Sequence, residues 1–172
     1  MKSQTFRIRV RQFIFGLSIL ILIATAKFSA AGDPPIDYSA VQKSLPDKIS
    51  LEGKVVYVDF WASWCLPCRK SFPWMQSMYD DYHSKGLEIV AVNVDIDHKS
   101  ATKFLEENQV TFPVVFDSTG DLARLYGLEA MPTSFIYGRD GKLASQHLGF
   151  QEEGADDLEG VILELLTRKA TK

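Results

Sequence analysis

Two continuous apolar runs mark the centre of the chain. Residues 55–61 are Val-Val-Tyr-Val-Asp-Phe-Trp, and residues 87–95 are Leu-Glu-Ile-Val-Ala-Val-Asn-Val-Asp. A strand that faces water on one side alternates apolar and polar residues, whereas these runs hardly do so. We therefore predict two buried central strands in a sheet that helices cover on both faces.

A helical pattern follows the first run, from Cys65 to about Lys85. Its apolar residues recur at steps of three and four positions, as on the inward face of a helix: Phe72, Met75, Tyr79 and Tyr82. Pro73 lies inside this pattern and should kink the helix. After the second run, Asp97 is a good N-cap for a second helix that ends near Asn108.

The last third of the chain predicts shorter elements. In order they are a strand or extended segment at 110–116, a short helix ending at 126–127, strands at 133–137 and 142–148, and a helix at 152–168. An Asp-Gly pair at 140–141 favours a tight hairpin between the last two strands. The order βαβαβαββα predicts an α/β fold whose mixed sheet is parallel at first and ends in an antiparallel hairpin.

The first 31 residues have the pattern of an export signal. Lys2, Arg7, Arg9 and Arg11 form a basic head, an apolar run covers 13–26, and small residues follow it. The run is shorter than the roughly 20 residues that a membrane-spanning helix prefers, which favours a cleaved signal peptide. An uncleaved membrane anchor stays open as the alternative, because flanking residues can extend the apolar stretch. In both cases we expect the body outside the cytoplasm, in a periplasm or on the outer face of the cytoplasmic membrane.

Residues 32–50 begin with Gly, Asp and two Pro and continue with mixed polar residues. We expect a linker or a loosely docked N-terminal arm there, with a short edge strand at Ile49 to Leu51. Residues 51–172 then form one domain around one hydrophobic core. Without residues 1–31 the chain has 14 Lys and Arg against 22 Asp and Glu, a net charge of −8. That balance argues against a nucleic acid as partner.

The only two cysteines, Cys65 and Cys68, directly follow the first apolar run. Such a pair can be half of a zinc site, a structural disulfide or a redox pair. Zinc prefers about four ligands, and the histidines show no ligand spacing. A disulfide across so small a loop would remove little chain entropy. Redox chemistry is favoured, because the first sulfur would lie at a helix N-terminus, where the reactive thiolate is stabilised.

Several separated motifs together resemble the thioredoxin superfamily. Residues 58–68, Val-Asp-Phe-Trp-Ala-Ser-Trp-Cys-Leu-Pro-Cys, are similar to the thioredoxin active-site segment, and Met131-Pro132-Thr133 is similar to its cis-proline loop. The helix and extended segment at 97–117 resemble the insertion of the exported TlpA/DsbE-like branch. The resemblance implies a thioredoxin-like fold, with a mixed central sheet flanked by helices and an extra helix-plus-extended insertion. It also implies an exported thiol–disulfide oxidoreductase that needs no bound cofactor.

The resemblance assigns roles at the dithiol. Cys65 would be the exposed nucleophile that attacks the disulfide of a client protein, and Cys68 the more buried thiol that releases the client. Asp59 is a carboxylate in a run that should be buried, which tends to raise its pKa. It matches the aspartate that exchanges a proton with the second cysteine in thioredoxins. Thioredoxins have a lysine near this acid on the next strand, where the matching position here is Val92.

Five further residues are expected to contact the client: Trp64, Pro67, Met131, Pro132 and Gly149. A cis peptide bond before Pro132 would leave the backbone of Met131 free to pair with an extended client strand. Gly149 resembles the glycine that lets a client approach closely. The alternatives are a gap-filling Met131 and an ordinary strand-end Gly149. We expect Trp61 to be structural and Trp74 to be a partially exposed surface residue.

The remaining acidic residues and histidines are not expected to form a metal site. Asp95, Asp97 and His98 could be imagined as a metal cluster, but helix capping and surface solvation explain them better. His83 and His147 are expected on the surface. We therefore predict no metal site.

The favoured function is reduction of disulfides in protein clients, with electrons from a membrane donor. The TlpA/DsbE-like resemblance makes apocytochrome c a possible client. The two residues between the cysteines, Leu66 and Pro67, are uncharged and neither is a histidine, which favours a reducing protein. One alternative is a copper-chaperone-like module in which Met131 joins the two cysteines as a ligand. Another is a disulfide oxidant or isomerase, whose reduction potential would lie nearer about −120 mV than about −270 mV.

Overall fold

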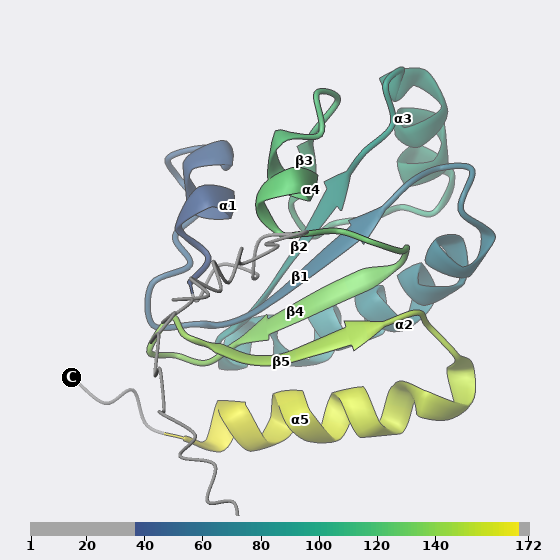
Figure 1. Ribbon diagram of the computed structural model, residues 1–172. Helices are drawn as coiled ribbons and strands as arrows, with labels where there is room; N and C mark the ends of the chain where they lie inside the picture. Colours follow the sequence, from purple (N-terminus) through teal and green to yellow (C-terminus); the bar gives the residue numbers. More distant parts are fainter. Residues whose placement is uncertain (1–36, 169–172) are drawn as a thin grey trace, which may run out of the picture.

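A five-stranded mixed sheet forms the centre of the protein. The computed structural model describes residues 37–168, and its strands are β1 (Val55–Trp61), β2 (Leu87–Asn93), β3 (Val114–Phe116), β4 (Thr133–Tyr137) and β5 (Leu143–Leu148). Their order across the sheet is β3-β2-β1-β4-β5 (Figure 1). The first three strands are parallel, whereas β4 runs antiparallel to both β1 and β5. The predicted mixed sheet is therefore confirmed. The predicted signal peptide or anchor lies outside the described residues.

Helices cover both faces of this sheet. Their bounds are α1 (Ser39–Ser44), α2 (Leu66–Tyr82), α3 (His98–Glu107), α4 (Asp121–Leu125) and α5 (Ala155–Thr167), with short 3-10 turns at His83–Lys85 and Glu152–Gly154. The predicted extra helix-plus-extended segment corresponds to α3 and the residues that lead into β3. Among the described residues, no helix is long and apolar enough to cross a membrane.

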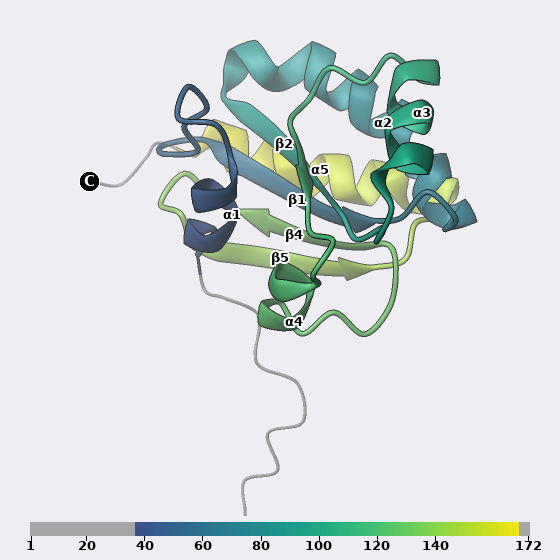
Figure 2. The ribbon, with the colours of Figure 1, turned by 90° about the horizontal axis from the view of Figure 1, so that it is seen from above.

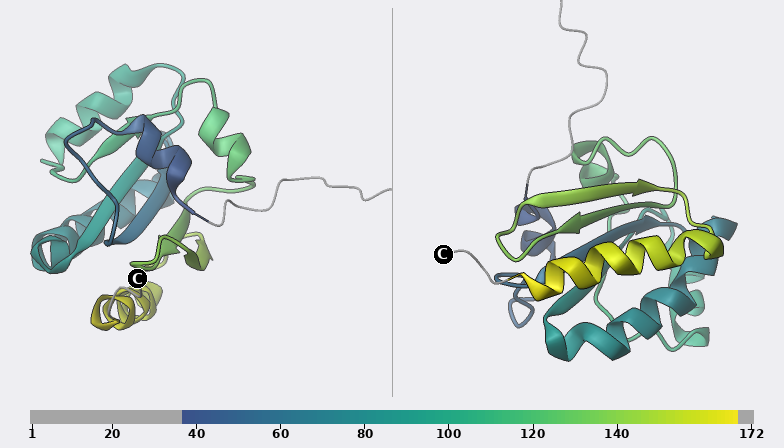
Figure 3. Two further views of the ribbon diagram at one scale, coloured as in Figure 1. Left: turned by 90° about the vertical axis from the view of Figure 1, so that its left-hand side faces the viewer. Right: turned by 90° about the horizontal axis from the view of Figure 1, so that it is seen from below.

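Side chains of β1 alternate between two hydrophobic cores. Tyr57 and Trp61 pack in one core, whereas Val58 and Phe60 pack in the other. The helices α2, α3 and α5 cover the first face of the sheet, and α1 and α4 cover the second (Figures 2 and 3). Every residue of β1 and β2 is buried, as the missing alternation predicted. The ring centroid of Trp61 lies 4.6 Å from that of Phe72, which confirms a structural place for this tryptophan.

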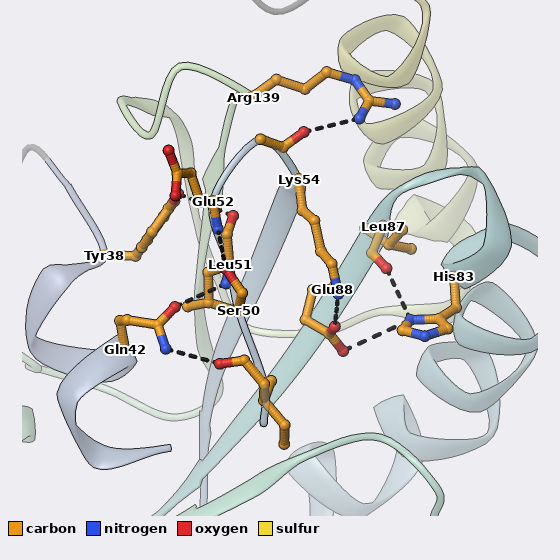
Figure 4. A network of polar contacts seen from close by, with 12 residues as sticks. Tyr38, Gln42, Ser50, Leu51, Glu52, Lys54, His83, Leu87, Glu88 and Arg139 are labelled. Carbon is orange, nitrogen blue, oxygen red and sulfur yellow. Dashed lines mark hydrogen bonds and ion pairs between the residues drawn. The ribbon is translucent and has the colours of Figure 1, made fainter. Parts of the chain in front are cut away.

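The predicted edge strand at Ile49 to Leu51 is wrong. These residues form a loop whose backbone is bound by the side chain of Gln42 in α1 (Figure 4). The Gln42 amide donates to the Ile49 carbonyl (2.8 Å), and its carbonyl oxygen accepts from the Leu51 N–H (2.7 Å). The Tyr38 hydroxyl donates to the Leu51 carbonyl (2.9 Å). These contacts satisfy backbone N–H and carbonyl groups of the loop, so it needs no strand partner. The helix α1 also buries Val41 in the second core.

Two further expectations differ in detail. β2 ends at Asn93, whose side-chain oxygen accepts from the Asp95 N–H (3.2 Å) and closes a turn. β3 begins only after Pro113, which has no N–H to donate to a strand. Trp74 is partially exposed, as expected, but it also packs on the core, with its ring edge-on to Tyr57 and the centroids 5.7 Å apart.

A polar network lies where β1 and β2 begin, at the opposite end of β1 from the cysteines (Figure 4). Lys54 Nζ lies 2.5 Å from one carboxylate oxygen of Glu88, and His83 Nδ1 lies 3.7 Å from the other. Glu88 is buried, so the lysine compensates a charge that would be costly alone. His83 Nδ1 also lies 3.2 Å from the Leu87 carbonyl oxygen, and 43% of its side chain is exposed. The network therefore joins the end of α2 to the start of β2.

Arg139, in the turn between β4 and β5, joins three more segments at this end. Its guanidinium donates to the carbonyl oxygens of Gly53 (3.0 Å), Lys85 (2.9 Å) and Leu166 (3.3 Å). Gly86 has a φ of +101°, and a Cβ there would lie only 2.6 Å from the guanidinium. A single side chain of the hairpin thus holds the turns before β1 and β2 and the end of α5 together.

Replacing Arg139 with alanine should lower the free energy of unfolding by about 2–3 kcal/mol, because three carbonyl oxygens lose a charged donor. Urea unfolding followed by circular dichroism measures this as a lower midpoint with an unchanged slope. Arg124→Ala is the control, since that arginine makes an exposed ion pair with Asp121 that should contribute less than about 1 kcal/mol. Equal losses in the two variants would contradict the special role of Arg139.

Candidate functional site

The two cysteines lie where β1 ends and α2 begins. Cys65 is the N-cap of α2, and its Sγ accepts a hydrogen bond from the Cys68 N–H (3.3 Å). Pro67 occupies the first turn, where a missing N–H costs nothing. The sulfurs are joined in a disulfide with an S–S distance of 2.00 Å and a Cα–Cα distance of 5.3 Å. The predicted placement at a helix N-terminus is confirmed, and the pair lies within bonding distance.

The exposure of the two cysteines differs less than predicted. Cys65 is only 6% exposed and Cys68 is fully buried, so an exposed Cys65 is wrong for the disulfide form. The reason is local, because the disulfide and the Cys68 N–H both hold the Cys65 sulfur against the first turn of α2. The neighbouring side chains are the exposed ones, with Trp64 at 71% and Leu66 at 63%. Cys65 is still the more accessible member of the pair.

Asp59 is a buried carboxyl group in the middle of β1. It is 1% exposed, and its Oδ2 has no hydrogen-bond partner within the described residues. Burial raises the pKa of this group well above its usual value, which favours the protonated form. Tyr57 and Trp61 lie two positions away on the same face as α2, so Asp59 points to the side of the sheet that holds the cysteines. The predicted burial is confirmed, and its part in proton transfer stays a prediction.

The residue opposite Asp59 on β2 is Ala91, not Val92. The register pairs Asp59 with Ala91 on β2 and with Ser134 on β4. Val92 packs in the core on the other face of the sheet. An off-by-one strand register exchanges the two faces, which explains the error. Neither strand partner carries a positive charge that would favour the ionised carboxylate.

Four of the five predicted client-contact residues line one hollow of about 440 Å³. They are Pro67 from α2, Met131 and Pro132 from the loop before β4, and Gly149 after β5. The Met131–Pro132 peptide bond is cis, as predicted. The Gly149 N–H donates to the Pro132 carbonyl (2.7 Å), and its φ of +78° favours glycine. His147, expected only as a surface residue, is half-buried and also lines this hollow. Contact with a client stays a prediction for all of them.

Trp64 lies instead beside a second hollow, of about 360 Å³. Its walls include Ser63 and Trp64 from the loop before α2, Arg69 from α2, and Lys103 and Phe104 from α3. Sequence reasoning did not single out Arg69, because a basic residue early in a helix is usually solvated. The available signal was its position one helical turn after Cys65.

Asp95 is a buried residue of the site rather than a solvated one. It is 5% exposed, and its Oδ2 accepts from the Ser63 N–H (2.9 Å) and from the Asn93 side-chain amide (3.0 Å). This carboxylate therefore ties the end of β2 to the loop that precedes Cys65. Asp97 caps α3 as expected, with its Oδ1 accepting from the Lys99 N–H (3.1 Å). Within residues 37–168, no group of three or more His, Cys, Asp and Glu is placed to hold a metal ion.

Comparison with known sequences gives a consistent relationship. The AhpC/TSA family model matches residues 31–146. The thiol-disulfide oxidoreductase ResA of Oceanobacillus iheyensis is 34% identical over 151 residues, which cover 77% of this chain and 79% of that protein. The ResA of Bacillus subtilis is 38% identical over 103 residues, which cover 60% of this chain and 58% of that protein.

Solved structures show the same relationship in three dimensions. A structure described as the thiol:disulfide interchange protein DsbE of Chlorobium tepidum superposes with a TM-score of 0.66 at 50% identity, covering 67% of this chain and 82% of that chain. StoA of Bacillus subtilis superposes with a TM-score of 0.56 at 33% identity, covering 63% and 82%. With its thioredoxin-like fold and its Cys65–Cys68 pair, the chain belongs to the AhpC/TSA family, within which it is a thiol–disulfide oxidoreductase similar to ResA and DsbE.

Proposed function

We propose that this protein is exported and reduces disulfides in client proteins with the Cys65/Cys68 dithiol. The observation that carries the proposal is the placement of the pair at the start of α2. Cys65 caps the helix and is the more accessible residue, whereas Cys68 is enclosed. In the reduced protein the helix N-terminus favours a thiolate on Cys65, which is the form that attacks disulfides. Export is supported by the pattern of residues 1–31.

Reduction of a client takes two exchange steps. The Cys65 thiolate attacks one sulfur of the client disulfide and displaces the other as a thiolate, which takes up a proton. Cys68 then loses its proton and attacks Cys65 Sγ, which expels the second client thiolate and forms the Cys65–Cys68 disulfide. The second client thiolate also takes up a proton. The client has then gained two electrons from the dithiol and two protons, one released by Cys68 and one from solvent. A membrane electron donor must therefore reduce the pair before the next cycle.

Asp59 is the group we propose for the proton of Cys68. Attack by Cys68 requires its thiolate, and a fully buried thiol cannot give its proton directly to water. Burial raises the pKa of the Asp59 carboxyl group, which makes its carboxylate a stronger base toward a thiol proton than an exposed one. Asp59 points to the face of the sheet on which Cys68 is buried, which supports this assignment.

The hollow at Pro132 is the surface we propose for the client chain. Within the described residues the backbone of Met131 takes part in neither strand ladder of β4, which begins at Thr133. An extended client can therefore pair with that backbone while its disulfide lies over Cys65. Space beside Gly149 is open, since no atom outside its chain neighbours would meet a Cβ there within 4 Å. Leu148, 63% exposed, offers an apolar contact at the rim.

Apocytochrome c is the client we favour, and reduction is the direction we favour. Similarity to ResA and DsbE supports the first, and the uncharged Leu66-Pro67 pair between the cysteines supports the second. A positive group there would stabilise the thiolate further and make the protein more oxidising.

The function can be tested with the purified body of the protein after complete reduction. It should reduce a peptide disulfide at neutral pH, and equilibration with glutathione should give a potential nearer about −270 mV than −120 mV. A potential at the oxidising end would make the protein an oxidant instead. If the reduced protein leaves peptide disulfides intact, the proposed reductase function is wrong.

A further inference from the structure

The hollow beside Trp64 contains a cation from the turn of α2 that follows Cys65. Arg69 lies one turn after Cys65, and its backbone N–H donates to the Cys65 carbonyl (3.1 Å). Its guanidinium carbon lies 5.1 Å from the centre of the Phe104 ring, which supports the flat face of the side chain. The hollow is lined by Ser63 and Trp64, directly before Cys65, and by Arg69 one turn after it, and it shares no residue with the hollow at Pro132.

The guanidinium of Arg69 is free to bind an anion. Within residues 37–168 it makes no hydrogen bond or ion pair, and its stacking on Phe104 leaves the N–H groups at its edge unused. The other two charged residues of the hollow are paired with each other, with Lys103 Nζ 3.7 Å from a Glu107 carboxylate oxygen. One uncompensated positive charge therefore remains in the hollow.

The carboxylate that binds the loop before Cys65 is already engaged. Asp95 is buried, and its Oδ2 accepts from the Ser63 N–H and the Asn93 amide, so it is committed to the loop rather than to Arg69. The body as a whole carries a net charge of −8, which by itself would repel acidic segments. At physiological salt such distant charges are screened beyond about 8 Å, so the local charge of Arg69 decides which groups can enter the hollow.

We propose that this hollow is a specificity subsite that binds an acidic side chain next to the client's cysteine. The inference rests on the proposed function, since it assumes that the client is a protein disulfide. A guanidinium presents a fork of N–H donors that matches a carboxylate in two parallel hydrogen bonds. Ser63 and Ser100 add small polar walls, and the exposed Trp64 also lines the hollow. The client is thereby recognised at two separate hollows, by its backbone at Pro132 and by a carboxylate at Arg69.

Symmetric disulfide dimers of single-cysteine peptides test this subsite. The peptides differ only in one residue beside the cysteine, which is Glu, Gln or Lys, and reduction by the fully reduced protein is followed by stopped-flow fluorescence. The wild type should reduce the Glu peptide about fivefold faster in kcat/KM than the Gln peptide, as for a strong surface ion pair. Arg69→Met keeps an apolar contact with Phe104 and should bring that ratio to about one. Raising the salt concentration should lower the wild-type ratio of kcat/KM values toward one.

Lys70→Met is the matched control, since Lys70 is the next basic residue of α2 and does not line the hollow. It should keep the wild-type ratio. A wild-type ratio of one, a ratio that survives in Arg69→Met, or a ratio that salt does not change would overturn the subsite while reduction of the Gln peptide still supports the reductase function. Failure of the wild type to reduce any of the three peptides would instead overturn the proposed function itself.

Discussion

Replacing Cys68 with serine should convert the protein into a trap that holds its clients covalently. Cys65 can still attack a client disulfide, but no second thiol is present to release the mixed disulfide. Turnover should fall by at least about a hundredfold, because an external thiol must replace a positioned intramolecular one. Non-reducing electrophoresis of the variant expressed in its host, followed by mass spectrometry, measures the adducts. Apocytochromes among them would identify the pathway.

The same substitution at the other cysteine, Cys65→Ser, is the control. It leaves Cys68, which is fully buried at the first turn of α2, as the only thiol. We expect neither adducts nor reduction of peptide disulfides from this variant. Adducts on Cys65→Ser together with none on Cys68→Ser would exchange the roles of the two cysteines and contradict the mechanism.

Features that depend on neighbours along the chain could be predicted from the sequence. The apolar run of β1, interrupted only by Asp59, reflects a strand covered on both faces. Cys65 is followed by a helical period, so its place at the helix start could be inferred. The Met131–Pro132 cis bond could be expected only through the resemblance to thioredoxins, since nothing in the local residues requires it.

Features that depend on packing between distant segments could not be predicted. Asp95 follows a strand, where carboxylates are usually solvated, and its burial becomes visible only when the Ser63 N–H is placed beside it. The same holds for Arg69, whose support is a ring on α3. The helix α1 is too short to show a period, and its docking depends on the two bonds of Gln42 to a loop.

Asp59→Asn should make the protein more stable at neutral pH and slower in releasing its client. Burial raises the pKa of Asp59 in the folded state above the ordinary value of 3.8. Between these two values the folded protein holds a proton that the unfolded chain has lost, so stability falls as pH rises. The loss is up to about 1.4 kcal/mol for each pH unit in that window. The asparagine variant lacks this titration, so its advantage should grow with pH when urea unfolding is measured from pH 4 upward.

Asp121→Asn provides a control of opposite sign. Hydrogen bonding to Thr119 lowers the pKa of this exposed carboxyl, so its contribution is present at neutral pH and is lost as pH falls through the folded value. Asp121→Asn should therefore leave unchanged the fall in unfolding free energy with rising pH that Asp59 causes. Equal pH slopes in the wild type and in Asp59→Asn would show that Asp59 does not hold a proton in the folded protein.

The kinetic half of the Asp59 prediction separates proton transfer from stability. Formation of the mixed disulfide uses the Cys65 thiolate and should proceed at nearly the wild-type rate in Asp59→Asn. Attack by Cys68 should be slower by about a hundredfold at neutral pH, as when a general base is removed. The deficit should shrink at high pH, where hydroxide can remove the thiol proton. Rapid quench of the mixed disulfide resolves the two steps. A variant that is more stable and yet releases its client at the wild-type rate would show that the buried carboxyl has no part in proton transfer. The mechanism requires the ionised Asp59 carboxylate, and burial of that negative charge is what destabilises the folded protein.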